Sequence, residues 1–270
     1  MDRPLVVLDT ETATSRGAPH LLELGAVRVV DGEIEDTFES LVCPPVEIEP
    51  ETTAFHGITD LDVRQAPLVH EVLARFTEWV GDDWMAAHNA GADTSVLAFE
   101  YARAGMEPPP GPFLDSLRLA VRHIPDSPDH KLPTLVQVLE FEDECSHRAL
   151  GDAVLCWKVI EECLERAGGL AEARLAELLT QGGAPLTLPG RRPDPPRMSP
   201  RLRPLEGAIA ETAQVTILYG EDDHAAPIPL SVTPLFLYGR NGKSYLEAEC
   251  GSSGLLKTYR LDRIRKVLTG

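Results

Sequence analysis

The chain has 270 residues, of which 43% are hydrophobic and 25% charged, and its formal net charge at pH 7 is −18. This length and composition are ordinary for a globular protein with one large domain or two. No stretch is long and apolar enough to span a bilayer and no signal-peptide pattern opens the chain, so we expect a cytoplasmic protein without a membrane partner. The five cysteines lack C-x-x-C spacing, which predicts reduced thiols and no zinc site.

The charge is distributed unevenly along the sequence. Residues 1–168 contain 32 acidic and 12 basic side chains, whereas residues 169–270 contain 11 acidic and 13 basic ones. Charge alone would not let the acidic first part bind a nucleic acid, because such binding depends on Lys and Arg contacts with phosphates. If this part acts on a polyanion, it needs bound cations or help from the basic C-terminal part.

The first predicted element is an apolar strand, Pro4 to Leu8, that leads directly into Asp9 and Glu11. A continuous apolar run of this kind is typical of a strand that is buried on both faces. Residues i and i+2 of a strand point to the same face, so the two carboxylates project side by side. Such a pair is either solvated at a strand end or stabilised by a cation between its members. The strand alone leaves both interpretations open.

Alternating and helical patterns follow the first strand. Further strands are predicted at 21–30 and 34–42, joined by the turn Asp31-Gly32, and at 84–87 and 113–115. Apolar residues at helical spacing predict helices at 67–80, from Asp93 to the prolines at 108–110, at 115–123, at 133–140 and at 150–167, and Thr59 is a candidate helix cap. This order predicts an α/β fold with a mixed five-stranded sheet and flanking helices.

The composition changes after a short amphipathic segment at 170–179. Residues 182–204 are rich in proline and contain five arginines, which is typical of a partly extended linker. From residue 205 the sequence shows short strands at 214–219, 228–238, 244–249 and 255–261, separated by turns. We therefore predict a first domain at 1–168, a helix and linker at 169–204, and a small all-β domain at 205–270.

Four acids and one histidine lie at the boundaries of predicted elements. They are Asp9, Glu11, Asp93, His147 and Asp152. Asp93 could simply cap its helix, Asp152 could be a favourable first-turn acid, and His147 could be an exposed loop residue. Together, however, they supply what a two-metal phosphodiesterase site requires: carboxylates for two divalent cations, and an imidazole that can deprotonate water.

Residues 1–168 resemble the DEDDh 3′–5′ exonucleases of the DnaQ-like, ribonuclease-H-like superfamily. The matching segments are Asp9-Thr10-Glu11-Thr12, His88-Asn89-Ala90-Gly91-Ala92-Asp93 and His147-Arg148-Ala149-Leu150-Gly151-Asp152-Ala153, with further similarity at His56-Gly57-Ile58-Thr59 and Lys131-Leu132-Pro133-Thr134-Leu135. One residue departs from the family pattern: Ala92 stands where an aromatic residue usually precedes the acid of the second motif.

The resemblance implies a ribonuclease-H-like fold and a role for each motif residue. Asp9, Glu11, Asp93 and Asp152 would hold two Mg²⁺ or Mn²⁺ ions, and His147 would be the general base. The side chains or backbone of Thr10, Thr12, His88 and Asn89 would contact the terminal nucleotide.

Residues 205–270 resemble a WYL domain, a small SH3- or Sm-like β-barrel. The resemblance rests on Val215 to Tyr219, on Ser244-Tyr245-Leu246 in place of the namesake tripeptide, and on the closing Arg260-Leu261-Asp262-Arg263-Ile264 string. It implies a basic and aromatic pocket for a ligand, often nucleic acid or a nucleotide, formed here by Tyr219, Tyr245, Arg260 and Arg263. Alternatively the tyrosines belong to the core and the arginines to a solvated edge. The linker arginines could add a phosphate track or only keep the linker soluble.

Together these features predict a metal-dependent 3′–5′ exonuclease that releases nucleotides from single-stranded nucleic acid, with DNA favoured, in repair or end processing. The C-terminal domain would grip the substrate or sense a ligand. One alternative is an exoribonuclease that clears oligonucleotides, which the extra β domain disfavours. The other is a non-catalytic WYL-type sensor on an inactive exonuclease scaffold, which the filled catalytic positions disfavour.

Overall fold

The computed structural model describes the chain except for residues 1–2, 143–146, 170–175, 179–184, 221–225 and 269–270. The chain divides into two compact units, Met1–Arg192 and Pro193–Gly270. Among the described residues, no helix combines the length and the apolar character needed to cross a membrane.

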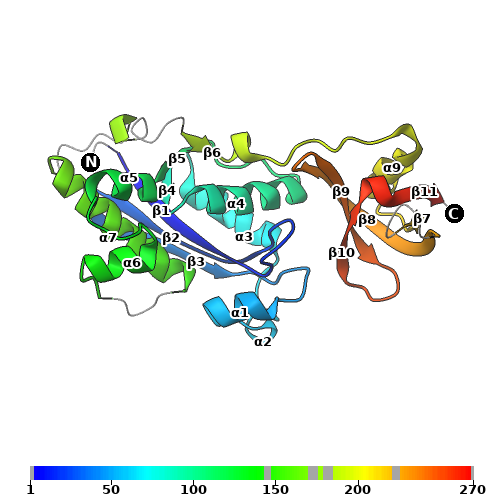
Figure 1. Ribbon diagram of the computed structural model, residues 1–270, viewed down its shortest axis with the longest axis horizontal. Coiled ribbons are helices and arrows are strands. Elements are labelled where there is room, and N and C mark those ends of the chain that lie inside the picture. Colours follow the sequence, from blue (N-terminus) through cyan, green and yellow to red (C-terminus); the bar gives the residue numbers. More distant parts are fainter. Residues whose placement is uncertain (1–2, 143–146, 170–175, 179–184, 221–225, 269–270) are drawn as a thin grey trace. The chain divides into compact units, whose positions relative to one another are not determined.

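A mixed sheet of six strands forms the centre of the N-terminal unit, in the order β3-β2-β1-β4-β5-β6 (Figure 1). The strands are β1 (Leu5–Thr12), β2 (Leu21–Val30), β3 (Glu33–Leu41), β4 (Trp84–Ala87), β5 (Pro112–Asp115) and β6 (Leu186–Thr187). β1 is antiparallel to β2 and parallel to β4, and β4 is parallel to β5. The carboxyl ends of β1, β4 and β5 therefore meet at one edge of the sheet, where α/β proteins place their sites.

The prediction of a five-stranded sheet was wrong by one strand. β6 comes from the proline-rich segment after the last long helix, and its Leu186 pairs with Phe113 of β5 in an antiparallel register. β6 has only two residues, between Pro185 and Pro189, so it has no apolar alternation by which a strand could be predicted. The following residue, Leu188, is fully buried in the core of this unit.

Helices cover both faces of the sheet. On one face lie α3 (Val69–Val80) and α4 (Gly91–Ala104), and on the other lie α5 (Ser116–His123), α6 (Leu132–Val138) and α7 (Ala149–Ala167). β1 contributes to both cores, because Leu5 and Val7 pack with α7 whereas Val6 and Leu8 pack with α3 and α4. The prediction of a first strand buried on both faces is confirmed.

Two short helices, α1 (Pro50–His56) and α2 (Asp60–Val63), lie between β3 and α3. They were not predicted, because helices of seven and four residues are too short for a periodic pattern. Thr59 caps α2 in a capping box with Asp62, as the sequence predicted. Asp31 and Gly32 both have positive φ, which confirms the hairpin turn between β2 and β3.

The C-terminal unit contains a five-stranded antiparallel sheet in the order β10-β9-β8-β7-β11. Its elements are the helix α9 (Pro204–Glu211) and the strands β7 (Val215–Tyr219), β8 (Ile228–Arg240), β9 (Lys243–Cys250), β10 (Leu256–Arg260) and β11 (Ile264–Leu268). β11 was not predicted, because the short 3-10 helix Leu261–Arg263 separates it from β10. The pairings within the described residues do not join β10 to β11, so a closed barrel stays a prediction.

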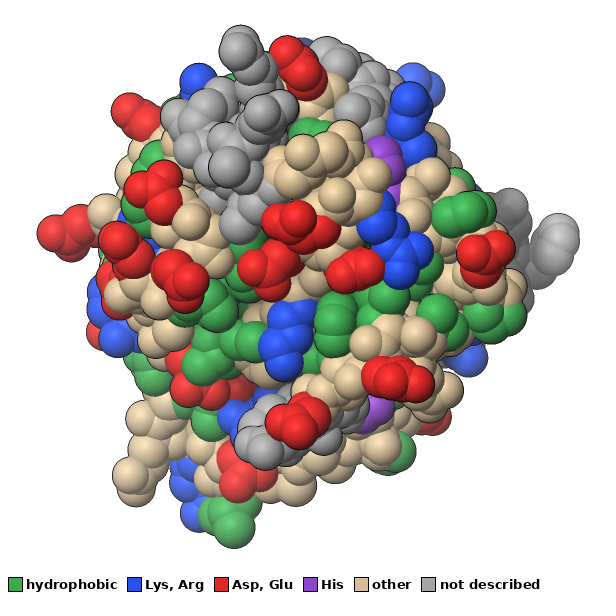
Figure 2. Space-filling model, turned by 90° about the vertical axis from the view of Figure 1, so that its left-hand side faces the viewer, with side chains coloured by type: hydrophobic (Ala, Val, Ile, Leu, Met, Phe, Trp, Pro, Cys, Tyr) green, Lys and Arg blue, Asp and Glu red, His purple; other side chains and the backbone are tan. Residues whose placement is uncertain are grey.

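The predicted amphipathic segment at 170–179 falls largely outside the described residues, which here include only the helical residues 176–178. Two further 3-10 helices, Pro189–Arg191 and Pro200–Leu202, occur within the segment predicted as a linker. Figure 2 shows one face of the molecule with acidic side chains spread across much of it, as the net charge of −18 predicts.

Candidate active site

Asp9 and Glu11 occupy the carboxyl end of β1. Both side chains lie on the face that α7 covers, because they continue the alternation of Leu5 and Val7. Glu11 is 7% exposed, although it is an acid. Asp9 is half-buried, so two carboxylates on neighbouring same-face positions of a central strand lose much of their hydration together, which requires compensation by positive charge or by protonation.

Asp152 comes to this edge on the first turn of α7. Its carboxylate and those of Asp9 and Glu11 each offer an oxygen, and these three atoms lie within 4.8 Å of one another. The close approach depends on Gly25 of β2, since a Cβ there would lie 2.1 Å from the backbone nitrogen of Leu150. A glycine in β2 therefore lets the start of α7 lie directly on the sheet.

Asp93 comes from the other side of the sheet, on the first turn of α4. It is 4% exposed, and its Oδ1 accepts a hydrogen bond of 2.8 Å from the Thr10 hydroxyl. Thr10 points away from Asp9 and Glu11 because strand residues alternate, so it links the β1 strand to the acid on α4. The neighbouring Ala92 is exposed, so an aromatic side chain at this position would lie at the surface and not in the core.

Simultaneous ionisation of all the acids of this site is unfavourable. Burial, followed by the charges of Asp93, Asp152 and Glu11, raises the pKa of Asp9 well above its usual value. Burial and the charge of Asp152 raise the pKa of Glu11 to about 8, and burial raises that of Asp93 to about 6. A hard divalent cation prefers carboxylate oxygens and removes this repulsion, so the donor set fits such an ion.

His147 lies beside the acids, just before α7. It adopts a left-handed backbone conformation with φ of 64°, and its ring centroid lies 4.4 Å from that of Phe55 on α1. Both rings line a pocket of about 200 Å³ together with Asp9, Glu11 and Asp152. The remaining wall of the pocket is formed largely by apolar residues, namely Leu132, Pro133, Val136 and Leu155. A group in this pocket would contact the acids, the imidazole and an apolar surface at once.

His88 also lines the pocket, but both of its ring nitrogens are hydrogen-bonded to other groups of the protein. Nδ1 lies 2.8 Å from the Ser116 hydroxyl, and Nε2 lies 2.8 Å from the His130 carbonyl oxygen. A carbonyl oxygen only accepts, so Nε2 carries the proton and Nδ1 accepts from Ser116. Burial lowers the pKa of His88, which keeps the ring neutral. The ring fastens the end of β4 to the segment that begins α6.

The other two residues predicted to contact substrate also bond within the protein. The backbone N–H of Asn89 donates to Asp115 at 3.1 Å, and Asn89 has a positive φ of 60°. The Thr12 hydroxyl donates to the carbonyl of Thr14. A contact of Thr10, Thr12, His88 or Asn89 with a nucleotide stays a prediction.

In the C-terminal unit, the predicted ligand residues fall into two neighbouring groups. Tyr245 on β9 lies opposite Arg260 on β10, and it stacks on Tyr238 with 5.2 Å between the ring centroids. Tyr219 contacts Tyr259 edge to face at 5.3 Å, and its hydroxyl accepts from the backbone nitrogen of Arg260. Tyr219 packs against the core, whereas Tyr245 is not part of it.

Further contacts around the predicted ligand residues of the C-terminal unit were not predicted. Arg260 forms an ion pair with Asp262, and the carbonyl of Arg263 accepts from the Gly220 backbone. Phe236 extends the stacked rings, since its centroid lies 5.6 Å from that of Tyr238. Phe236 and Tyr238 escaped notice in the sequence because a bulge between Pro234 and Phe236 interrupts the alternation of β8.

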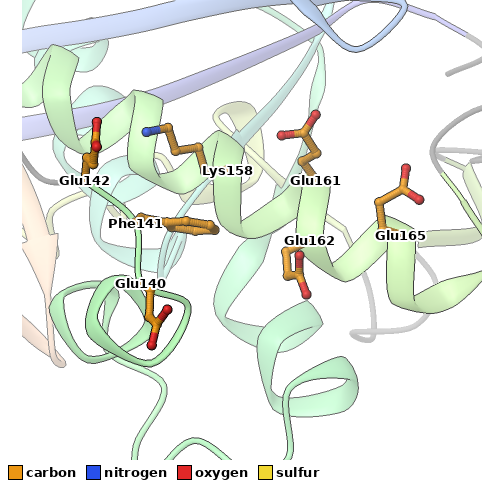
Figure 3. Close-up of a pocket in the computed structure, with 7 residues that line it drawn as sticks. All are labelled: Glu140, Phe141, Glu142, Lys158, Glu161, Glu162 and Glu165. Atoms are coloured by element: carbon orange, nitrogen blue, oxygen red, sulfur yellow. The ribbon is translucent and has the colours of Figure 1, made fainter.

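A second acidic hollow, of about 500 Å³, lies between α7 and the segment after α6 (Figure 3). Its lining residues are Glu140, Phe141, Glu142, Lys158, Glu161, Glu162 and Glu165. Lys158 approaches the ring of Phe141 at 5.8 Å, and Glu162 pairs with Arg166 at 2.7 Å.

Several residues in and beside the first pocket were missed in the sequence. The buried Glu23 forms an ion pair with the exposed Arg148 just before α7, and in the pocket wall Phe55 contacts His147. Glu23 could have been suspected, because it is an acid between leucines in the apolar first half of β2. Phe55 gave no such signal, because its helix has only seven residues.

The mixed sheet with helices on both faces, and with acids gathered where its central strands end, is a ribonuclease-H-like fold. Residues 6–160 match the model of a family described as "Exonuclease", and residues 200–268 match that of the WYL domain. The chain therefore belongs to the exonuclease family, in its DEDDh branch, and carries a C-terminal WYL domain. Both resemblances noted in the sequence are confirmed.

The relatives differ in how much of this chain they match. DNA polymerase III PolC-type of Oceanobacillus iheyensis is 38% identical over 167 residues, which are 60% of this chain but only 12% of that polymerase. A solved structure of exonuclease X in complex with 5′ overhanging duplex DNA is 25% identical, with a TM-score of 0.55, and covers 66% of this chain and 99% of that one. Exonuclease I shares the fold at 12% identity and a TM-score of 0.55, and covers 99% of this chain and 65% of that one.

Proposed function

We propose that the protein is a metal-dependent 3′–5′ exonuclease that releases nucleotides from the 3′ end of single-stranded DNA, in repair or end processing. The observation that carries the proposal is the convergence of Asp9, Glu11 and Asp152 within 4.8 Å, in a pocket that also contains His147. Such an arrangement supplies both the cation ligands and the proton acceptor that phosphodiester hydrolysis needs.

The residues of the site have separate roles in this proposal. Asp9, Glu11 and Asp152, which lie within 4.8 Å of one another, would hold two Mg²⁺ or Mn²⁺ ions together with Asp93, which the Thr10 hydroxyl orients. Bound cations of this kind supply charge neutralisation at the phosphodiester and a water that ionises more readily. His147 accepts a proton from the attacking water. The apolar wall of Leu132, Val136 and Leu155 limits the access of bulk water to the imidazole.

DNA is the favoured substrate because of the comparisons. The relative from Oceanobacillus iheyensis is a DNA polymerase, and the exonuclease X structure contains DNA. Purified protein is tested on 5′-labelled single-stranded DNA and RNA with Mn²⁺, Mg²⁺ or EDTA. We expect a ladder that shortens from the 3′ end of DNA with either metal and is absent with EDTA. Preferential shortening of RNA would favour an exoribonuclease, and cleavage of neither polymer would favour an inactive scaffold.

We further propose that the C-terminal unit is an SH3- or Sm-like barrel that grips the strand. The half-buried rings of Phe236 and Tyr245 both stack on the buried Tyr238, and Tyr245 lies opposite Arg260. Aromatic rings with nearby guanidinium groups hold bases and phosphates without sequence preference. Arg263 and Tyr219 would extend this surface. We expect the double variant Tyr245→Ala/Arg260→Ala to bind long strands about tenfold or more weakly, since stacking contributes about 1–3 kcal/mol per base.

The length of the substrate separates gripping from catalysis. The double variant is expected to cleave a trinucleotide at the wild-type rate, because the exonuclease pocket is untouched. The matched control is Leu235→Ala, which removes an exposed apolar side chain from β8, the strand that pairs with β9. Unchanged binding of a long strand, with an unchanged salt dependence, would contradict the gripping role.

A further inference from the structure

Glu23 is a buried acid that has no part in the reaction as proposed so far. It lies in β2 directly opposite Glu11 of β1, and its side chain is completely buried. Directly opposed residues of an antiparallel pair point to the same face, and like charges in such a pair destabilise the sheet. A fifth buried carboxylate beside the four acids of a cation site is therefore unfavourable unless other groups stabilise its charge.

The partners of Glu23 among the described residues lie at the start of α7. The Arg148 Nε donates to both carboxylate oxygens at 3.1 Å, and the Arg148 Nη2 donates to Oε1. The backbone nitrogen of Ala149 donates to Oε2 at 3.0 Å. Ala149 is the first residue of the helix, and its N–H has no acceptor within the helix. Glu23 thus caps α7 from a neighbouring strand, where a negative charge also favours the helix dipole.

These contacts act on the residues that the reaction uses. Arg148 directly follows His147, and Ala149 lies three residues before Asp152. Gly25, two residues farther along β2, sets how closely α7 approaches the sheet. The direction in which α7 begins is then set by the bonds of Arg148 and Ala149 to Glu23.

We propose that Glu23 is a positioning residue that holds His147 and Asp152 in place through Arg148 and Ala149. This inference rests on the proposed exonuclease function. Without the carboxylate, Arg148 and the first turn of α7 lose their shared acceptor. Arg148 also stabilises Glu23, because its guanidinium neutralises the buried carboxylate. This pairing reduces the repulsion between Glu23 and the proposed cation ligands.

The test uses the full chain and the variants Glu23→Gln, Arg148→Met, the corresponding double variant, and Glu39→Gln as the matched control. Glu39 is an exposed acid of β3 that faces the same guanidinium at 4.0 Å. For each protein, kcat and KM are measured on single-stranded DNA, the Mn²⁺ affinity is measured by calorimetry, and the folded fraction is checked by thermal unfolding.

Glu23→Gln is expected to lower kcat by about 10- to 100-fold with KM within about twofold, because small displacements of catalytic groups are costly. It should also weaken Mn²⁺ binding by about tenfold, because the turn of α7 that places Asp152 loses its support, and contacts that support metal ligands are worth about 10- to 100-fold. Arg148→Met should be worse, because it leaves a buried charge unpaired, and adding Glu23→Gln to it should restore part of the loss. Glu39→Gln should match the wild type.

Wild-type kcat and Mn²⁺ affinity in a folded Glu23→Gln protein would overturn the inference. Losses of kcat in the double variant that equal the product of the two single losses would overturn it as well.

If the wild type cleaves no nucleic acid, the proposed function fails. An unchanged Mn²⁺ affinity in Glu23→Gln would then overturn the inference separately. If Glu23→Gln does not fold, Arg148→Lys takes its place, since lysine keeps the charge but not the paired hydrogen bonds. Its kcat should then fall while its folded fraction stays that of the wild type, and an unchanged kcat would overturn the inference.

Discussion

Two hollows of the N-terminal unit are lined by carboxylates, and they differ in where those carboxylates come from. In the pocket at the end of β1, acids from a strand and a helix far apart in sequence converge, and Asp93 reaches the same edge from the other face of the sheet. In the hollow of Figure 3, the acids lie on one face of α7 and on the segment before it.

The surroundings of the acids differ as well. Glu140, Glu142 and Glu165 of the second hollow are exposed, and Lys158 and Arg166 provide positive charge nearby. Burial and the charge of Glu33 raise the pKa of Glu161, which is half-buried. At the end of β1, burial raises the pKa of Asp9, Glu11 and Asp93, and repulsion by neighbouring acids of the site raises the pKa of Asp9 and Glu11 further. The number of acids in a hollow is therefore a poor guide, whereas burial and convergence from separate elements indicate a cation site.

The largest expected effect separates the two hollows directly. Asp9→Asn should lower the rate of DNA cleavage by more than about 100-fold, since even outer partners of metal ligands are worth 10- to 100-fold. Glu161→Gln is the matched control in the second hollow and should cleave at the wild-type rate. Both are compared by single-turnover cleavage of 5′-labelled DNA. Equal losses in the two variants would show that the hollows do not differ in function.

Removal of the base should impair the chemistry without impairing cation binding. His147→Ala is expected to lower kcat by about 10²- to 10⁴-fold, the usual contribution of a positioned general base. Its Mn²⁺ affinity, measured by calorimetry, should stay that of the wild type because His147 is not one of the ligands. His70→Ala, an exposed histidine on α3, is the control. A large loss of Mn²⁺ affinity in His147→Ala would contradict this separation of roles.

Stability should depend on cations and on pH because of the first pocket. The raised pKa of Glu11, about 8, means that the folded chain binds more protons than the unfolded chain above pH 4.5, so stability without a cation falls as pH rises toward 8. Mn²⁺ at a hundredfold excess over its Kd should add about 2.7 kcal/mol. Thermal unfolding at pH 6 and 8, with Mn²⁺ or EDTA, measures both effects. Asp9→Asn should reduce the Mn²⁺ effect and Glu161→Gln should not.

The smallest effect concerns the aromatic rim of the same pocket. Phe55→Ala removes the ring that contacts His147, and aromatic pairs contribute about 0.5–1.5 kcal/mol, which corresponds to a two- to tenfold lower kcat. Phe55→Tyr should keep the wild-type rate. Leu61→Ala removes an equally exposed apolar side chain from α2 and serves as the control. A wild-type rate in Phe55→Ala would show that the ring contact does not orient the imidazole.

Much of this protein was predictable from its sequence because the relevant signals are local. The apolar run before Asp9 specified a buried central strand, and α4 and α7 are long enough for helical spacing to identify them. The motif acids could be named because each follows or opens an element with a clear pattern. The match to the exonuclease family spans residues 6–160, which include all of these acids.

Only the tertiary structure decided which residues meet. β6 exists because β5 offers it an unpaired edge, and two residues between prolines carry no pattern of their own. The contact of Phe55 with His147 joins residues 92 positions apart, and the bonds of Glu23 to Arg148 and Ala149 join residues at least 125 apart. Such contacts depend on how helices lie on the sheet, and that is decided by packing at positions such as Gly25. A linear pattern contains the residues of this site, but not the distances that give them a common function.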